Sequence, residues 1–189
     1  MSIQRQDDTK YRIQYRLLAW KSGGGNQCYA LANDLDQAND NLELAKKIVE
    51  VNPPIKDFVV IKQNLIERRD GKGFFEILPA GDVVGTHGKT YLFVGFDEIH
   101  GYKTWDILEA MQLDPTRPDA LQWITSYASI YHKPGVPLFD LFAAGKKGQD
   151  PRMLFSCNSA KCGNACRVGP STKRKKDRSG VNEHWESND

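Results

Sequence analysis

Stretches expected to form strands alternate with stretches expected to form helices along most of this chain, and this alternation restricts its fold more than any other feature. Four mostly apolar runs are expected to form strands: Cys28–Ala32, Tyr91–Phe96, Leu121–Tyr127 and Arg152–Ser156. Strands that alternate with helices are typical of a parallel sheet covered on both faces. The sequence therefore predicts an α/β fold, with a parallel sheet flanked by helices.

The clearest helix is expected directly after the first of these strands. Its apolar stripe repeats every three or four residues and is formed by Leu35, Ala38, Leu42, Ala45 and Val49. Asp34 is suited to cap the start of the helix, and Gln37 completes a capping box. Asn52-Pro53-Pro54 is expected to end it.

The remaining elements follow from similar patterns. Further helical segments are expected at 11–20 (with Ile13, Leu17 and Leu18 on one side), Thr104–Leu113 and Val136–Lys147. A hairpin is expected around Asp70-Gly71-Lys72-Gly73, between Phe58–Arg68 and Phe74–Leu78.

The composition changes after residue 156. Residues 157–189 hold seven basic and four acidic side chains, a net charge of +3, whereas residues 1–156 hold nineteen and twenty, a net charge of −1. The last segment has few large apolar residues, so it buries too little surface to offset its ordering entropy. We expect a folded domain at 1–156 and a basic, disordered tail at 157–189.

Composition also bears on the cellular compartment. The 189 residues carry a formal charge of +2 and include four cysteines, too few for a disulfide framework. No stretch approaches the roughly 18 apolar residues of a membrane span, and the first ten residues lack the apolar core of a signal peptide. A reduced cytoplasmic protein without membrane association is expected.

The sharpest chemical signal is the pair Asp97-Glu98, which directly follows the apolar run Tyr91–Phe96. Sheets of α/β proteins bind ligands at the carboxyl ends of their strands. In nucleotide hydrolases of the P-loop type, one acid there supports Mg²⁺ and another orients the attacking water. The alternative interpretation is a strand that ends at a solvated acidic turn.

Gly85–Thr90 has the composition of a phosphate-binding loop but not its pattern. The P-loop motif requires a glycine six positions before its lysine, and for Lys89 that position is Val83. It also requires a following helix, whereas here a strand follows. We interpret this segment as a glycine-rich connection into the acidic strand.

Three segments in this order resemble the large terminase subunits of tailed bacteriophages. Residues 28–49 resemble the segment after the P-loop helix, Gly85–Lys103 resembles the Gly-His-Gly stretch with its Walker B strand, and residues 123–128 resemble the coupling motif. The resemblance covers roughly residues 10–156. It implies a P-loop NTPase-like ATPase that drives double-stranded viral DNA into an empty procapsid.

The resemblance assigns roles to individual residues. Asp97 would support Mg²⁺ through water and Glu98 would be the catalytic carboxylate, while Thr125 and Ser126 would couple loss of the γ-phosphate to DNA movement. ATP and Mg²⁺ are the implied cofactors. The implied partners are viral DNA, the small terminase subunit, the portal ring and further copies of the chain in a ring, in the cytoplasm of an infected or lysogenic bacterial host.

Two departures from the family pattern affect this expectation. Residues 1–10, which precede the helix at 11–20, contain no glycine, and Lys10 is the one candidate for the P-loop lysine. Nothing after residue 156 is long enough to supply the family's nuclease domain. We therefore expect a fold that is incomplete at its N-terminus, and a chain that on its own binds ATP weakly or is inactive.

The tail offers two further candidate sites. Cys157, Cys162, Cys166 and His184 lack the short paired spacing of most zinc sites, so zinc is not expected. A basic cluster could contact phosphate groups of DNA: Lys173, Arg174, Lys175 and Lys176. The alternative for this cluster is a solvated tail.

Three functions stay open at this point. The first is the ATPase core of a terminase, and the second is a non-enzymatic nucleic-acid-binding or interaction protein derived from that fold. A fragment of a DExH-type helicase is weaker, because Asp97–His100 fits it but Asn33–Ala38 does not.

Overall fold

The computed structural model describes residues 12–13, 15–20, 22–32, 35–79, 81–127, 131, 133–148, 150–157 and 166–168. The chain divides into two compact units, Met1–Ile130 and Tyr131–Asp189. The first unit contains the mixed sheet and the residues around Asp97.

The first unit is built on a six-stranded sheet in the order β2-β3-β4-β1-β5-β6. Its strands are β1 (Asn26–Ala32), β2 (Val59–Ile61), β3 (Leu65–Arg68), β4 (Gly73–Pro79), β5 (Phe93–Asp97) and β6 (Leu121–Thr125). Strand β1 pairs in parallel with both β4 and β5, and β5 pairs in parallel with β6. The expected α/β fold with a mostly parallel sheet is confirmed, and the antiparallel pairs β2–β3 and β3–β4 make the sheet mixed.

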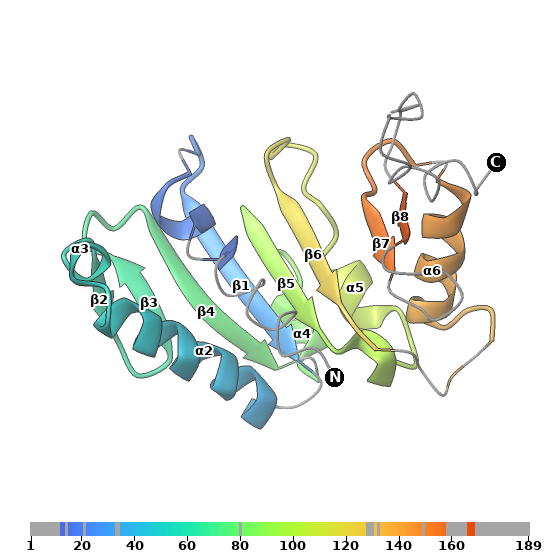
Figure 1. The fold of residues 1–189 in the computed structure, drawn as a ribbon, viewed down its shortest axis with the longest axis horizontal. Coiled ribbons are helices and arrows are strands. Elements are labelled where there is room, and N and C mark those ends of the chain that lie inside the picture. Colours follow the sequence, from blue (N-terminus) through green and yellow to red (C-terminus); the bar gives the residue numbers. More distant parts are fainter. Residues whose placement is uncertain are drawn as a thin grey trace, which may run out of the picture. The chain divides into compact units, whose positions relative to one another are not determined.

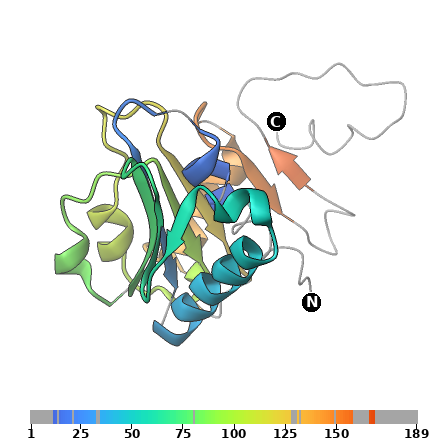
Figure 2. The same ribbon diagram turned by 90° about the vertical axis from the view of Figure 1, so that its left-hand side faces the viewer.

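Helices cover the two faces of this sheet (Figures 1 and 2). One face is covered by α2 (Leu35–Glu50), and the other by α4 (Val83–Thr86) and α5 (Asp106–Ala110). Successive residues of a strand point to opposite faces. Accordingly Cys28, Ala30 and Ala32 belong to the core on the α2 side, and the alternate residues of β1 point to the opposite face.

The predicted apolar stripe of α2 is confirmed where its side chains are described. Leu42, Ala45 and Val49 are buried in one core cluster, together with Ile13 and Leu17, which belong to the helical residues 12–13 and 15–18. The side chains at 35–38 and the residue Asp34 lie outside the described residues, so the expected N-cap stays a prediction.

Several predicted boundaries were wrong. Phe58–Arg68 was expected as one strand but forms two, β2 and β3, which pair with each other before the predicted hairpin to β4. Pro53 and Pro54 follow the end of α2 as expected, but they also begin a short helix, α3 (Pro53–Lys56). Proline is tolerated there because the first helical residues need no N–H partner.

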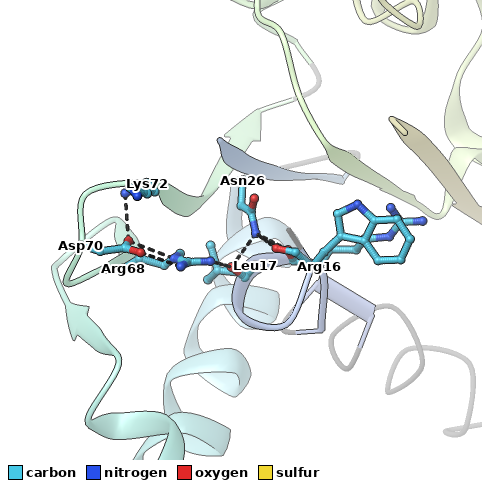
Figure 3. A network of polar contacts seen from close by, with 7 residues as sticks. Arg16, Leu17, Asn26, Arg68, Asp70 and Lys72 are labelled. Atoms are coloured by element: carbon cyan, nitrogen blue, oxygen red, sulfur yellow. Dashed lines mark hydrogen bonds and ion pairs between the residues drawn. The ribbon is translucent and has the colours of Figure 1, made fainter. Parts of the chain in front are cut away.

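The end of the helical segment 15–18 is held by the polar side chains of Asn26 and Arg68 (Figure 3). Asn26 at the start of β1 donates from Nδ2 to the carbonyl oxygens of Arg16, Leu17 and Trp20, at 2.8, 3.0 and 2.7 Å. Arg68 donates to the Leu17 carbonyl at 3.1 Å. These contacts satisfy carbonyl groups that a helix end otherwise leaves without partners.

The second unit contains α6 (Pro137–Lys147) and a two-stranded antiparallel sheet of β7 (Phe155–Cys157) and β8 (Cys166–Val168). The strand expected at Arg152–Ser156 is therefore shorter, and it lies in this small sheet and not in the parallel one. Residues 166–168 belong to the expected tail yet form a strand, because pairing with β7 supplies backbone hydrogen bonds that composition does not reveal. The boundary at residue 156 stays a prediction.

None of the helices in the described part of the chain is long and apolar enough to cross a membrane.

Candidate functional site

The carboxyl ends of β4, β1, β5 and β6 lie at one edge of the sheet. The register pairs Ala32 with Pro79 and Asp97 with Thr125, so the last residues of neighbouring parallel strands are adjacent. After β1 the chain forms β2, β3 and β4 on one side of that strand. It then crosses to the other side, where β5 and β6 follow. In open α/β sheets, a ligand site lies at the carboxyl edge where the strand order reverses in this way.

Asp97 and Thr125 are in direct contact at this edge. The Thr125 hydroxyl donates to Asp97 Oδ1 at 2.9 Å, and the Asp97 side chain is buried, with 7% of the residue exposed. A hydrogen bond to a charged group is worth about 1.5–3 kcal/mol. Thr125 therefore holds the carboxylate in one orientation at the end of β5.

Glu98 has an unusual backbone conformation. It lies at φ 56° and ψ 45°, the left-handed helical region, and among the described residues it is the one non-glycine residue with positive φ. Its N–H donates to the Thr125 carbonyl at 2.9 Å. Strained backbone of this kind concentrates at functional sites, because the surrounding structure must hold it in place.

The structure brings together three of the four residues predicted from the sequence for chemistry and coupling. Asp97, Glu98 and Thr125 are joined by the hydrogen bonds described above. Ser126 follows Thr125 in the chain, and its hydroxyl donates to the carbonyl of Tyr127 at 3.1 Å.

The other predicted binding residues cannot be placed. Lys10 and the basic cluster of Lys173, Arg174, Lys175 and Lys176 lie outside the described residues, as do Cys162 and His184. Cys157 and Cys166 are described and are register partners in the β7–β8 pair.

Gly85–Thr90 does not have the arrangement of a phosphate-binding loop. The short helix α4 ends at Thr86, before Gly88 with its φ of +78°, and β5 follows. Lys89 lies 3.9 Å from Glu76 Oε2, and its Nζ is 5.2 Å from the ring centroid of Tyr29. The interpretation as a connection into the acidic strand is confirmed.

Tyr102 is a residue of this region that the sequence reasoning missed. It follows the short 3-10 helix η1 (Ile99–Gly101) after Glu98, and the residue is only 7% exposed. Among the described residues its hydroxyl has no hydrogen-bond partner. Burial and, secondly, the negative charge of Asp97 raise the pKa of the Tyr102 phenol above its ordinary value. The one feature of the sequence that could have pointed to Tyr102 is its position five residues after Asp97.

The donor set at this edge fits a hydrated Mg²⁺ better than a metal held by protein alone. The described residues contain no group of three His, Cys, Asp or Glu side chains that could hold a metal. Mg²⁺ keeps several waters and is usually bound through one or two carboxylates together with phosphate groups. Asp97 and Glu98, adjacent in the chain at the end of β5, are carboxylates of this kind.

Comparison with solved structures gives the same fold. The chain is similar to the HK97 bacteriophage large terminase, with a TM-score of 0.59 at 19% sequence identity, over 79% of this chain and 33% of that one. It is also similar to the ATPase domain of the Thermus phage P74-26 large terminase, with a TM-score of 0.54 at 18% identity, over 75% of this chain and 60% of that one. No family model and no curated protein matches the sequence.

The structure thus defines an α/β fold with a mostly parallel sheet, and an acidic pair, Asp97 and Glu98, stands at the carboxyl end of β5. More narrowly, the fold is that of the ATPase domain of phage large terminases, which confirms the resemblance at the level of the fold. The chain spans about a third of the HK97 terminase and less than two thirds of the P74-26 ATPase domain.

Proposed function

We propose that this chain provides part of the ATPase of a phage terminase large subunit, the motor that packages double-stranded DNA. The observation that carries the proposal is the contact between Asp97 and Thr125 at adjacent strand ends, with Glu98 bound to the same threonine through its N–H. The fold shared with two phage large terminases supports it.

Each of the three residues has a distinct task in this proposal. Asp97 would hold Mg²⁺ through its water shell, and the chemistry that this ion would supply when bound is neutralisation of charge on the phosphate oxygens. Glu98 accepts a proton from the attacking water as general base, a role typically worth 10²–10⁴-fold in rate.

Thr125 serves as the link between the strands that carry the chemistry. It is bound to the Asp97 side chain through its hydroxyl and to the Glu98 backbone through its carbonyl. A shift of the carboxylates upon loss of the γ-phosphate would therefore move the end of β6. Ser126, as the next residue, would carry that movement into the following segment.

The wider assembly belongs to the same proposal. The partners are viral DNA, the small terminase subunit, the portal ring and neighbouring copies of this chain in a ring, inside an infected bacterial cell. The basic residues Lys173–Lys176 are candidates for DNA contact, and Lys10 for nucleotide contact.

ATP binding by the chain alone is expected to be weak. The donors that cradle phosphate in P-loop enzymes are backbone N–H groups of a glycine-rich loop, and Gly85–Thr90 does not have that arrangement. A micromolar ATP affinity with robust turnover would contradict this part of the proposal.

Single-turnover ATP hydrolysis at high protein concentration tests the enzymatic role. Glu98→Gln should reduce the rate at least about 100-fold, because it removes the base but keeps the size of the side chain. The control is Glu109→Gln, an exposed carboxylate in α5, which should leave the rate unchanged. A wild-type rate equal to that of Glu98→Gln would favour the non-enzymatic, nucleic-acid-binding alternative.

A further inference from the structure

The chain segments that follow β5 and β6 are also joined by a contact between two rings. The His100 ring in η1 lies edge-on to the Tyr127 ring, with ring centroids 6.1 Å apart and an interplanar angle of 63°. Edge-to-face packing of rings at such a separation is favourable beyond the area that it buries. His100 comes shortly after Glu98 and Tyr127 shortly after Thr125, so the ring contact continues the line of contacts between the two strand ends.

The strained backbone of Glu98 gives this contact a purpose. A non-glycine residue in the left-handed region persists only where the surrounding structure holds the chain in place. On the side of β5, the Glu98 N–H is bound to the Thr125 carbonyl at 2.9 Å. On the other side, Ile99 is fully buried and the ring of His100 meets Tyr127. The chain is therefore fixed to the end of β6 both at the strained residue and just beyond it.

The exposure of Tyr127 distinguishes this ring pair from ordinary core packing. Tyr127 is 46% exposed, so its ring contributes little to the buried core of the sheet. It directly follows Ser126, and the Ser126 hydroxyl donates to the Tyr127 carbonyl at 3.1 Å. The pair thus joins the turn that carries Glu98 to the segment for which the coupling role is proposed.

We propose that His100 and Tyr127 are positioning residues that together hold the turn carrying Glu98 against the end of β6. This role rests on the proposed function, because Glu98 is the general base proposed there. Misplacement of reacting groups by roughly 1 Å can cost about 100-fold in rate. Loss of the ring contact should therefore slow hydrolysis, whereas nucleotide binding, which depends on other groups, should change little.

A second ring pair of nearly the same geometry provides the control. Tyr15 and Trp20 lie edge-on, with ring centroids 6.3 Å apart and an interplanar angle of 63°. Tyr15 is likewise exposed, at 57%. The Trp20 carbonyl is bound by Asn26, the first residue of β1, so this pair lies near the amino end of that strand and not at the carboxyl edge.

The test combines the rate of ATP hydrolysis with thermal stability, in the full chain. His100→Ala, Tyr127→Ala and the double variant remove the ring contact, Tyr127→Phe keeps it, and Tyr15→Ala removes the control contact. Single-turnover hydrolysis over a range of ATP concentrations gives the maximal rate and the half-saturating concentration. The thermal midpoint of each variant is measured without nucleotide.

The ring contact and the control contact should behave differently. His100→Ala and Tyr127→Ala should each lower the maximal rate about tenfold and change the half-saturating ATP concentration by less than about twofold. The double variant should be no slower than the slower single variant, because the two residues act as one unit. Tyr127→Phe should keep most of the wild-type rate. Tyr15→Ala and Tyr127→Ala should both lower the thermal midpoint by about 2–4 °C, but Tyr15→Ala should leave the rate unchanged.

The contradicting outcomes separate this inference from the proposed function. A wild-type rate equal to that of Glu98→Gln removes the enzymatic role, and the positioning role with it. If the wild type is faster than Glu98→Gln but the alanine variants are as fast as the wild type, the role of the ring pair alone is overturned.

Three further results would overturn the role of the ring pair alone. The first is an effect on the half-saturating concentration without one on the maximal rate. The second is that the two alanine effects on the rate multiply in the double variant, or that their effects on the midpoint add, because the residues would then act independently. The third is that Tyr127→Phe is as slow as Tyr127→Ala, or that Tyr15→Ala is equally slow.

Discussion

The left-handed backbone of Glu98 makes a quantitative prediction about stability. A non-glycine residue in this conformation costs roughly 1–2 kcal/mol, because its Cβ lies too close to the following carbonyl oxygen. Glycine avoids that cost but loses about 0.5–1 kcal/mol more conformational entropy on folding. Glu98→Gly should therefore be more stable than Glu98→Ala by about 0.5–1 kcal/mol.

The comparison between alanine and glycine isolates the backbone. Both substitutions remove the whole carboxylate and every contact it makes, and both keep the N–H that donates to Thr125. The matched control is Glu109 in α5, an exposed residue in right-handed helix. There the order should reverse, with alanine more stable than glycine by about 1 kcal/mol.

Urea denaturation of the four variants measures these differences. The differences between alanine and glycine should have opposite signs at the two positions and be separated by about 1.5–2 kcal/mol. If Glu98→Ala is as stable as Glu98→Gly or more so, Glu98 is not held in a strained conformation. The interpretation of this residue as a strained functional position would then be refuted.

Three further substitutions test the structure around the site and in the second unit. Asn26→Asp should destabilise the protein more than Asn26→Ala in urea denaturation, because a carboxylate would face three helix-end carbonyls; the reverse order would contradict this contact. The hydrogen bond from Arg68 lowers the pKa of Asp70 from 3.8 to about 2, so its stabilising contribution is present above about pH 4 and lost toward pH 2. The urea midpoints of Asp70→Asn and the wild type should accordingly converge over that range, and a constant difference would contradict it. Gly145→Ala should destabilise the second unit by about 1–3 kcal/mol, because a Cβ would lie 2.3 Å from Phe155 Cδ2; an unchanged thermal midpoint would contradict that packing.

The parallel strands and the chemistry at their ends could be predicted because their signals are local. Tyr91–Phe96 is apolar throughout, as expected for a strand buried on both faces, and the following Asp97 ends β5 as predicted. The contact of Asp97 with Thr125 follows once both strands are placed in one parallel sheet, because their last residues share a register position.

Features that depend on tertiary contacts were not predictable from local patterns. No periodicity reveals that Glu98 is left-handed or that Tyr102 is buried, since both depend on how the chain turns after β5. The division of Phe58–Arg68 into β2 and β3 was missed for a similar reason. The turn between these strands carries no glycine or proline, the strongest local signals of a turn.

The central claim is that the carboxyl edge at Asp97 binds a nucleotide together with Mg²⁺, and thermal stabilisation by Mg-ATP tests it most directly. For an affinity near 1 mM, 5 mM Mg-ATP stabilises a protein by about 1 kcal/mol, which corresponds to a shift of about 2–4 °C. We predict this shift for the wild type and its loss in Asp97→Asn. No shift in the wild type, or an equal shift in Asp97→Asn, would contradict the claim.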